Sequence, residues 1–264
     1  AYHPQLLPDG KSLLFTFGNA SPYKIIVQSL QSGERQELFA GDNARYISTG
    51  HIVYGLGNNV FAVPFDLKTL KVTGGPVSVV EGIWRVGPDG PPQYAVSDAG
   101  TLIYIPGQTN VVASGQRTLA WVDRKGKEEP LAAGPNDYRG PQISPDGTKV
   151  ALTVYTGDKS DIWIWDLLRE TMTRLTFNEA SGSPLWTLNG QRIAFVSGGL
   201  DKAVVFWKAA NGTGEDEKLG SAPDRGLSPW SWSSDGKTLV VGEFPEGLNF
   251  DIGSLSMEGD HKWR

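Results

Sequence analysis

The fold of this chain is decided by one stretch, Gln142-Ile143-Ser144-Pro145-Asp146-Gly147-Thr148-Lys149-Val150-Ala151-Leu152. It joins a polar β-turn over 144–147 to an apolar run that begins at Val150. In such a turn, proline presets the first corner, aspartate accepts backbone N–H groups, and glycine supplies the positive φ. Apolar β-branched runs of this kind suit strands that are covered on both faces. The stretch therefore predicts two antiparallel strands joined by a tight turn.

The same turn recurs along the chain with varying fidelity. The glycine that ends each copy lies at positions 10, 50, 100, 147, 190 and 236, so successive copies are 40, 50, 47, 43 and 46 residues apart. A repeat of about 45 residues with four strands in each unit is typical of a β-propeller. The 33 glycines and 17 prolines of the chain fit an architecture of short strands and many turns.

We therefore predict an all-β fold, a six-bladed β-propeller of four-stranded antiparallel blades, formed by residues 1–264 as a single domain. The expected blade limits are 1–41, 42–82, 83–135, 136–179, 180–225 and 226–264. The sixth unit stops before a full fourth strand unless His261 to Arg264 begin one, so we expect an incomplete last blade.

Composition narrows the classes of function. The formal net charge is −5 and no basic stripe is present, which argues against nucleic-acid binding because phosphate contacts dominate that affinity. No apolar run reaches the length of a membrane span. The chain has no cysteine, which fits any compartment. It starts without Met and ends abruptly, so we interpret it as a piece of a longer protein.

Three motifs carry a family resemblance: Ser144-Pro145-Asp146-Gly147, Asp161-Ile162-Trp163 and Arg174-Leu175-Thr176. Together they resemble the repeat of TolB-like propellers, which are similar to WD40 repeats. The resemblance implies a rigid propeller that binds a partner through its loops, but a shared fold does not locate a site.

The first half of the chain shows a narrower resemblance. Its motifs are Leu7-Pro8-Asp9-Gly10, Pro64-Phe65-Asp66, Leu70-Lys71-Val72-Thr73-Gly74-Gly75-Pro76-Val77 and Trp121-Val122-Asp123-Arg124-Lys125-Gly126. These resemble the C-terminal propeller regions of bacterial receptor-like serine/threonine kinases, although kinase motifs are absent from this sequence. The resemblance implies a sensor or scaffold domain with a periplasmic or extracytoplasmic location.

The connections between blades supply the candidate binding residues. An arginine recurs at this junction in four blades, and four guanidinium groups could receive a carboxylate or a peptide C-terminus. The predicted ligand-binding residues are Arg45, Trp84, Arg85, Tyr138, Arg139, Glu179 and Arg225. The competing interpretation is that each arginine pairs with a nearby acid, such as Asp42, Asp137, Glu179 or Asp224.

No catalytic motif stands out. A nucleophile elbow of the type Gly-x-Ser-x-Gly is missing, and the three histidines have no metal-ligand spacing. The sequence therefore predicts a non-enzymatic module without a cofactor that binds a protein or peptide, in an oligomeric state that stays open. One alternative is a calcium-dependent hydrolase of lactones or phosphoesters, with metal ligands Asp42, Asn43, Asn178, Glu179 and Asp224. Another is a gating propeller attached to a peptidase.

Overall fold

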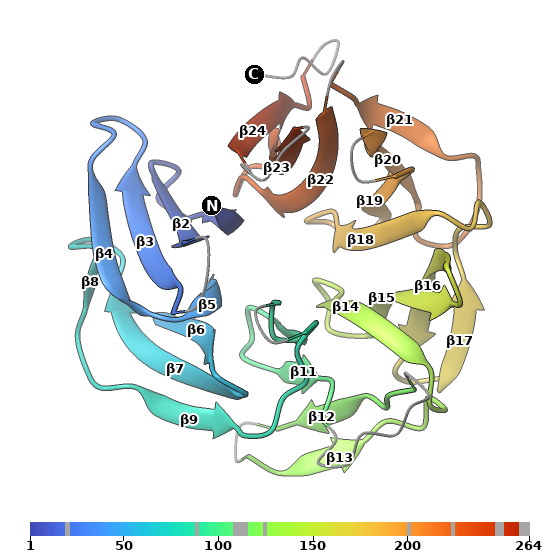
Figure 1. The fold of residues 1–264 in the computed structure, drawn as a ribbon, viewed down its shortest axis with the longest axis horizontal. Coiled ribbons are helices and arrows are strands. Elements are labelled where there is room, and N and C mark those ends of the chain that lie inside the picture. The colour runs from blue at the N-terminus through green and yellow to red at the C-terminus, as the bar shows by residue number, and fades with distance from the viewer. Residues whose placement is uncertain are drawn as a thin grey trace. The chain divides into compact units, whose positions relative to one another are not determined.

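The computed structural model of the chain describes residues 1–18, 22–87, 90–107, 116–123, 126–199, 202–222, 225–245 and 251–258. Within these ranges the secondary structure is β, without an α-helix, and the strands form six antiparallel sheets (Figure 1). No helix long and apolar enough to cross a membrane occurs in the part of the chain described. The predicted all-β class and the predicted six blades are confirmed.

The chain divides into two compact units, residues 1–115 with 119–131, and residues 116–118 with 132–264. The first unit holds three blades. Blade 1 consists of β1 (Tyr2–Leu6), β2 (Ser12–Phe17), β3 (Lys24–Ser29) and β4 (Arg35–Ala40). Blade 2 consists of β5 (Asp42–Ile47), β6 (His51–Leu56), β7 (Asn59–Asp66), β8 (Lys71–Val72) and β9 (Val77–Val80). Blade 3 consists of β10 (Tyr94–Val96), β11 (Leu102–Tyr104), β12 (Ala120–Val122) and β13 (Glu128–Pro130).

The second unit holds the other three blades. Blade 4 consists of β14 (Asp137–Ile143), β15 (Lys149–Thr156), β16 (Lys159–Asp166) and β17 (Thr171–Arg174). Blade 5 consists of β18 (Ser181–Trp186), β19 (Arg192–Ser197), β20 (Val204–Ala209) and β21 (Glu217–Gly220). Blade 6 has three strands among the described residues, β22 (Arg225–Trp232), β23 (Thr238–Pro245) and β24 (Asp251–Ser256). His261 to Arg264, which could have begun its fourth strand, lie outside the described residues.

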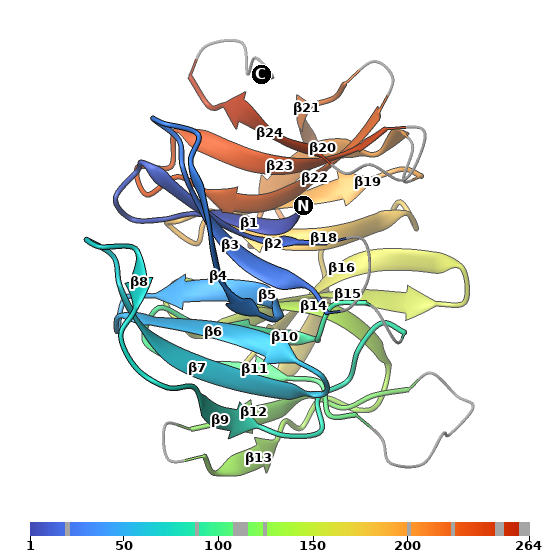
Figure 2. The same cartoon turned by 60° about the vertical axis from the view of Figure 1, so that its left-hand side comes forward.

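Blade 2 has a divided outer strand. β8 pairs with the end of β7, whereas β9 pairs with its beginning, where Val60 faces Val80 and Ala62 faces Val77. Figures 1 and 2 show β8 and β9 following each other along the outer side of β7. The residues between them include Gly74-Gly75-Pro76, a sequence that cannot donate a full set of ladder hydrogen bonds.

The recurring turn has the chemistry that its sequence predicts. In blade 4, Asp146 Oδ1 accepts hydrogen bonds from Thr148 N at 3.1 Å and Ser144 Oγ at 2.6 Å. These bonds favour the ionised carboxylate and hold the pKa of Asp146 below its ordinary value. Gly147 has a φ of 72°, in the left-handed region that glycine adopts at no steric cost. Asp146 therefore has its structural partners within its own turn.

The first strand of five blades carries a β-bulge, in which the strand gains a residue relative to its neighbour. In blades 1, 2 and 5 the bulge places a non-glycine residue at positive φ, namely His3 at 52°, Asn43 at 49° and Ser183 at 53°. A bulge locally redirects the side chain and ends regular pairing. The first strands of these blades therefore share a local distortion at corresponding positions.

Apolar cores form between neighbouring blades of each unit. Ile47, Val53 and Val80 of blade 2 share one cluster with Leu102 and Val122 of blade 3. In the second unit, clusters join residues of blades 4 and 5 and residues of blades 5 and 6. Within each unit, neighbouring blades therefore bury apolar faces against each other.

Candidate functional site

Arg85 and Asp42 form a buried ion pair in the first unit. Arg85 Nη1 lies 2.7 Å from Asp42 Oδ2 and Nη2 lies 2.9 Å from Oδ1, a bidentate geometry. The same guanidinium donates to the carbonyl oxygens of Gly57 and Gly90. Its side chain is 11% exposed and that of Asp42 is 9% exposed. Arg85 is therefore paired with Asp42, one of the acids that the sequence analysis named as possible partners of the arginines.

Arg45 and Asn43 contact backbone carbonyls of neighbouring blades. Arg45 Nη1 donates to His3 O at 2.9 Å, and Asn43 Nδ2 donates to Pro92 O at 3.1 Å. Tyr94 donates its hydroxyl proton to Asn43 O at 2.5 Å. Burial, together with the charge of Arg45, lowers the pKa of His3 from 6.5 to about 3, so its imidazole is neutral near pH 7. These contacts tie blades 1, 2 and 3 together.

Two aromatic candidates hold structural positions. The backbone N–H of Trp84 donates to Ile105 O at 2.8 Å, and its carbonyl accepts from Gln93 N at 2.9 Å. The ring of Tyr138 is buried, its hydroxyl donates to Gly134 O at 2.6 Å, and burial raises the pKa of Tyr138. A ligand-binding role of Trp84 and Tyr138 stays a prediction.

Two arginines share one carboxylate in the second unit. Arg117 Nη1 lies 2.5 Å from Asp137 Oδ1, and Arg139 Nη2 lies 3.1 Å from Asp137 Oδ2. Arg139 also stacks on a ring, with Cζ 4.0 Å from the centroid of Tyr155. Burial lowers the pKa of the Arg117 guanidinium. The positive charge of Arg139 also lowers it, whereas the negative charge of Asp137 raises it. This pair can offer planar hydrogen-bond donors to an anionic group.

Sequence reasoning identified Arg139 but missed Arg117. Arg117 precedes Asp137 by 20 residues and lies between β11 and β12 of blade 3, in a segment without a repeat signature. Its backbone pairs with Asn136 through reciprocal hydrogen bonds of 2.7 and 2.9 Å. That pairing brings the side chain to the start of β14, a placement that no local pattern reveals.

Arg225 at the start of β22 pairs with an acid of the adjacent strand. Its Nη1 lies 2.8 Å from Glu243 Oε2, and the Glu243 side chain is 6% exposed. The sequence suggested Asp224 as the partner, but Asp224 lies outside the described residues. Arg45 and Arg85 belong to the first unit, and Arg139 and Arg225 belong to the second. A single binding mouth formed by all four arginines stays a prediction.

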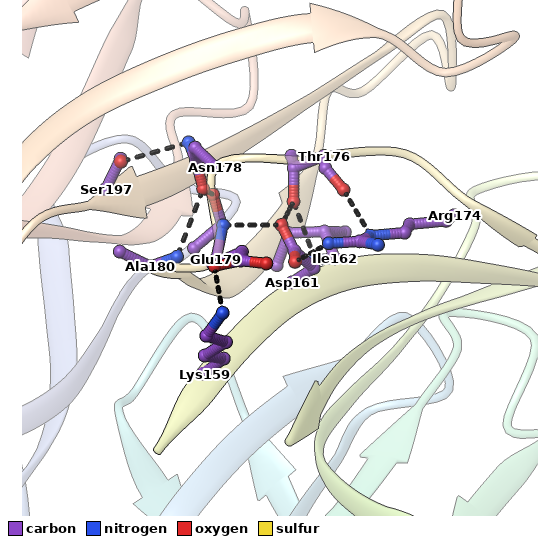
Figure 3. Close-up of polar contacts among 10 residues, drawn as sticks. Lys159, Asp161, Ile162, Arg174, Thr176, Asn178, Glu179, Ala180 and Ser197 are labelled. Carbon is purple, nitrogen blue, oxygen red and sulfur yellow. Dashed lines mark hydrogen bonds and ion pairs between the residues drawn. The ribbon is translucent and has the colours of Figure 1, made fainter. Parts of the chain in front are cut away.

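Glu179 and Asn178 lie in the connection from blade 4 to blade 5, which Figure 3 shows in close-up. The Glu179 carboxylate pairs with Lys159 Nζ at 2.5 Å, and its backbone has a positive φ of 62°. Asn178 donates from Nδ2 to Ser197 Oγ at 3.1 Å and accepts at Oδ1 from Ala180 N at 3.2 Å. Both side chains therefore hold the shape of this connection.

Asp161 is the hub of the same region (Figure 3). Its Oδ1 accepts a hydrogen bond from Thr176 Oγ1 at 2.8 Å, and Oδ2 lies 2.5 Å from Arg174 Nη2. The backbone N–H of Glu179 also donates to Oδ1 at 3.3 Å. The Asp-Ile-Trp and Arg-Leu-Thr motifs thus bind each other, and they fix the connection that follows them.

The predicted calcium ligands fall in separate units, with Asp42 and Asn43 in the first and Asn178 and Glu179 in the second. Among the described residues, no group of three or more histidine, aspartate or glutamate side chains could hold a metal ion. Asp42 already accepts two hydrogen bonds from Arg85. Calcium binding stays a prediction.

A cleft of about 450 Å³ opens in the first unit between blades 2 and 3. Its blade 2 wall comes from strands β5 to β7 and β9, and its blade 3 wall comes from β10 to β12 and the turn that follows. The lining residues are Ile47, Thr49, His51, Val53, Ala62, Val77, Ser78, Val79, Val96, Gly100, Leu102, Val122, Asp123 and Gly126. Volume and lining are typical of a ligand cleft, namely apolar walls with few polar groups. The sequence did not predict this cleft, because its walls come from separate strands of two blades.

No family model matches the chain. A Bacillus subtilis (strain 168) protein named uncharacterized peptidase YuxL is 31% identical over 108 residues, which cover 38% of this chain and 16% of that protein. The match therefore spans about a sixth of that relative.

Solved structures show the fold more completely. The crystal structure of TolB from Acinetobacter baumannii has a TM-score of 0.71 and 15% sequence identity, covering 97% of this chain and 64% of that chain. A structure of oligogalacturonate lyase in complex with manganese has a TM-score of 0.66 and 18% identity, covering all of this chain and 75% of that chain. The predicted resemblance to TolB-like propellers is confirmed for the fold, whereas the narrower resemblance to kinase-linked propellers stays a prediction. The chain is thus a six-bladed β-propeller, and TolB is among the proteins whose structures it resembles.

Proposed function

We propose that this chain is a non-enzymatic binding module that recognises a carboxylate of a protein or peptide partner at Arg117 and Arg139. The observation that carries the proposal is the convergence of these two guanidinium groups on the single carboxylate of Asp137. The two guanidinium groups bring positive charge and planar donors to one partly exposed place, where partial burial strengthens the attraction for a carboxylate because water screens the charges less.

Asp137 and Tyr155 act as positioning residues in this proposal. The carboxylate fixes both arginines from one side, and the Tyr155 ring supports the flat face of the Arg139 guanidinium. A guanidinium held in this way loses little conformational freedom when it binds, so more of the hydrogen-bond energy becomes affinity. The other predicted arginines support the proposal less, because Arg45 and Arg85 each donate to groups of the chain itself.

The site fits a sensor or scaffold domain of a larger bacterial protein, as the sequence resemblance implies. A propeller attached to a peptidase is the second candidate, because the matched Bacillus protein is named a peptidase. In that setting, the same arginines would receive the carboxylate of a peptide passing to the protease domain. The calcium-dependent hydrolase stays a prediction without a specific observation in its favour.

The test is titration of the chain with an N-acetylated alanine tripeptide that has a free C-terminal carboxylate, and with its C-terminal amide. NMR of the arginine Nε–H groups should show saturable shifts for the acid and none for the amide. Arg139→Gln should weaken binding at least about tenfold, because it removes one of two charged donors. The exposed Arg169 offers a matched control, and Arg169→Gln should bind as the wild-type chain does.

Two results would contradict the proposal. One is equal binding of the acid and the amide, which would show that the carboxylate is not recognised. The other is unchanged affinity of the Arg139→Gln variant in a chain that remains folded, which would place any binding elsewhere.

A further inference from the structure

Arg45 differs from the other described arginines that are not exposed. Each of the others forms an ion pair with a carboxylate, namely Arg85, Arg117, Arg139, Arg174, Arg192 and Arg225. Arg45 is half-buried in β5, and no aspartate or glutamate among the described residues pairs with it. Removing a charge from water without a counterion costs free energy, and burial accordingly lowers the pKa of Arg45. The position therefore favours an anion that the described part of the chain does not supply.

The groups near Arg45 do not neutralise its charge. Burial raises the pKa of Tyr94, so its hydroxyl stays protonated. His3 has a pKa of about 3, so its imidazole is neutral near pH 7. Asp42, the acid of the same strand, is held by Arg85 in a bidentate pair. The described residues around Arg45 thus leave one positive charge uncompensated.

The guanidinium of Arg45 also has hydrogen-bond donors to spare. Its Nη1 donates to His3 O at 2.9 Å, and that is its one hydrogen bond to the described residues. A guanidinium carries more N–H donors than this bond uses, and its Nε and Nη2 groups form a parallel pair on one edge. Such an edge matches the two oxygens of a carboxylate.

The backbone is fixed on both sides of Arg45. On one side, Tyr46 N donates to Gln5 Oε1 at 2.8 Å and Tyr46 O accepts from Gln5 Nε2 at 3.1 Å. On the other side, Asn43 lies in the bulge of β5 at a positive φ of 49°, and His3 lies in the bulge of β1 at 52°. Non-glycine residues at positive φ are strained, and such strain clusters at ligand sites. The guanidinium is thus positioned before a ligand arrives, which lowers the entropy lost on binding.

We infer that Arg45 forms an anion site of its own, which binds the carboxylate of a small molecule through its Nε and Nη2 groups. One cation matches one negative charge, so a monocarboxylate suits the site better than a phosphate dianion. Half-burial of the guanidinium favours a compact group over a protein segment. The site lies in the first unit, whereas Arg117 and Arg139 belong to the second, so the inference does not rest on the function proposed for them.

The experiment titrates the full chain with sodium acetate at constant ionic strength and follows the arginine Nε–H signals by NMR. The Arg45 signal, identified by its loss in Arg45→Lys, should shift with half-saturation at millimolar acetate, as expected for two charged hydrogen bonds. Acetamide, which has the same shape but no charge, should leave the signal in place. Inorganic phosphate at pH 8 should bind at least about threefold more weakly than acetate, because its second charge has no partner.

A pair of variants locates the site. Both are made in an Arg139→Gln background, which removes a donor from the other candidate site. Arg45→Lys keeps the charge but lacks the paired donors, so thermal unfolding should show at least about tenfold weaker stabilisation by acetate. Arg169→Lys, at an exposed arginine, is the matched control and should be stabilised like its parent.

Four results would overturn the inference: no saturable shift of the Arg45 signal, an equal shift with acetamide, tighter binding of phosphate than of acetate, or unchanged acetate affinity after Arg45→Lys. The shift is measured in the wild-type chain, so the first three results stand even if Arg45→Lys does not fold. The Arg45 signal should respond to acetate equally in the wild-type chain and in Arg139→Gln. Failure at Arg45 therefore leaves the tripeptide test at Arg139 undecided, and the reverse also holds.

Discussion

Asp42 and Asp137 each begin the first strand of a blade, but they meet arginine in different ways. Asp42 is 9% exposed and holds Arg85 alone, in a bidentate pair. Asp137 is 25% exposed and is shared by Arg117 and Arg139. An aspartate at the same place in the repeat is thus buried with one arginine at Asp42, whereas at Asp137 it is partly exposed beside two arginines.

The difference shows why an arginine at a junction is not by itself a binding signal. Arg85 has its guanidinium bound by one carboxylate and two carbonyl oxygens, so a ligand would have to displace groups of the chain. At Asp137 one carboxylate contacts two guanidinium groups, and solvent reaches both arginine side chains. The degree of burial therefore separates the structural pair at Asp42 from the candidate site at Asp137.

The largest expected effect comes from removing Asp42, and removal of Asp137 is the matched comparison. Asp42→Ala should lower the free energy of unfolding by about 3–5 kcal/mol, because it leaves a buried arginine without its counterion. Asp137→Ala should cost less than about 1 kcal/mol, because both arginines remain partly solvated. Urea denaturation followed by tryptophan fluorescence measures both values. Equal losses would remove the distinction between the two junctions.

Replacing arginine by lysine sharpens the comparison. Arg85→Lys should destabilise the chain by about 1–3 kcal/mol, since lysine cannot reproduce the bidentate pair or the bond to Gly57 O. Arg139→Lys should change stability by less than about 0.5 kcal/mol. Thermal unfolding of the two variants is the measurement, and a larger shift for Arg139→Lys would reverse the interpretation.

The acid sensitivity of the first unit should depend on His3. Its pKa is about 3 in the folded chain and returns to about 6.5 on unfolding, so the unfolded chain binds the extra proton. Stability should therefore fall as the pH falls from about 6.5 towards 3, by at most about 1.4 kcal/mol per pH unit. His3→Asn, which tolerates the positive φ, should flatten this dependence. Denaturation midpoints at pH 7 and pH 5 provide the test, and an unchanged slope would contradict it.

The smallest expected effect is that of salt. A double-mutant cycle between Asp137 and Arg139 should give a coupling of about 0.2–1 kcal/mol at low salt, which falls towards zero in 1 M NaCl. The coupling between Asp42 and Arg85 should persist, because buried charges are screened less. A coupling between Asp137 and Arg139 that persists in 1 M NaCl would indicate that this ion pair is buried as well.

Much of the fold was predictable because its signals are local. The glycine of each turn must adopt positive φ, and the Asp-Ile-Trp and Arg-Leu-Thr motifs pair within one blade, so each repeat shows in the sequence. The division of the outer strand of blade 2 was not predicted. It depends on which part of β7 the chain meets after Gly74-Gly75-Pro76, which is a tertiary choice.

The candidate sites were less predictable because they depend on distant pairings. Asp42 was among the acids expected from the sequence as possible partners of the arginines. Whether Arg85 pairs with such an acid or binds a ligand depends on burial, which the sequence does not show. Glu243 was missed as the partner of Arg225, since it lies on the neighbouring strand 18 residues later. The cleft needs walls from two blades, so no single motif reports it.

The bulges of the first strands have a consequence for how such a chain can diversify. Corresponding blades place His3, Asn43, Gly140, Ser183 and Trp230 in them. A bulged residue is released from regular strand pairing, so its side chain can change while the sheet around it keeps its hydrogen bonds. Each bulge is therefore a position at which the repeat can carry a different side chain while the hydrogen bonding of the blade stays the same.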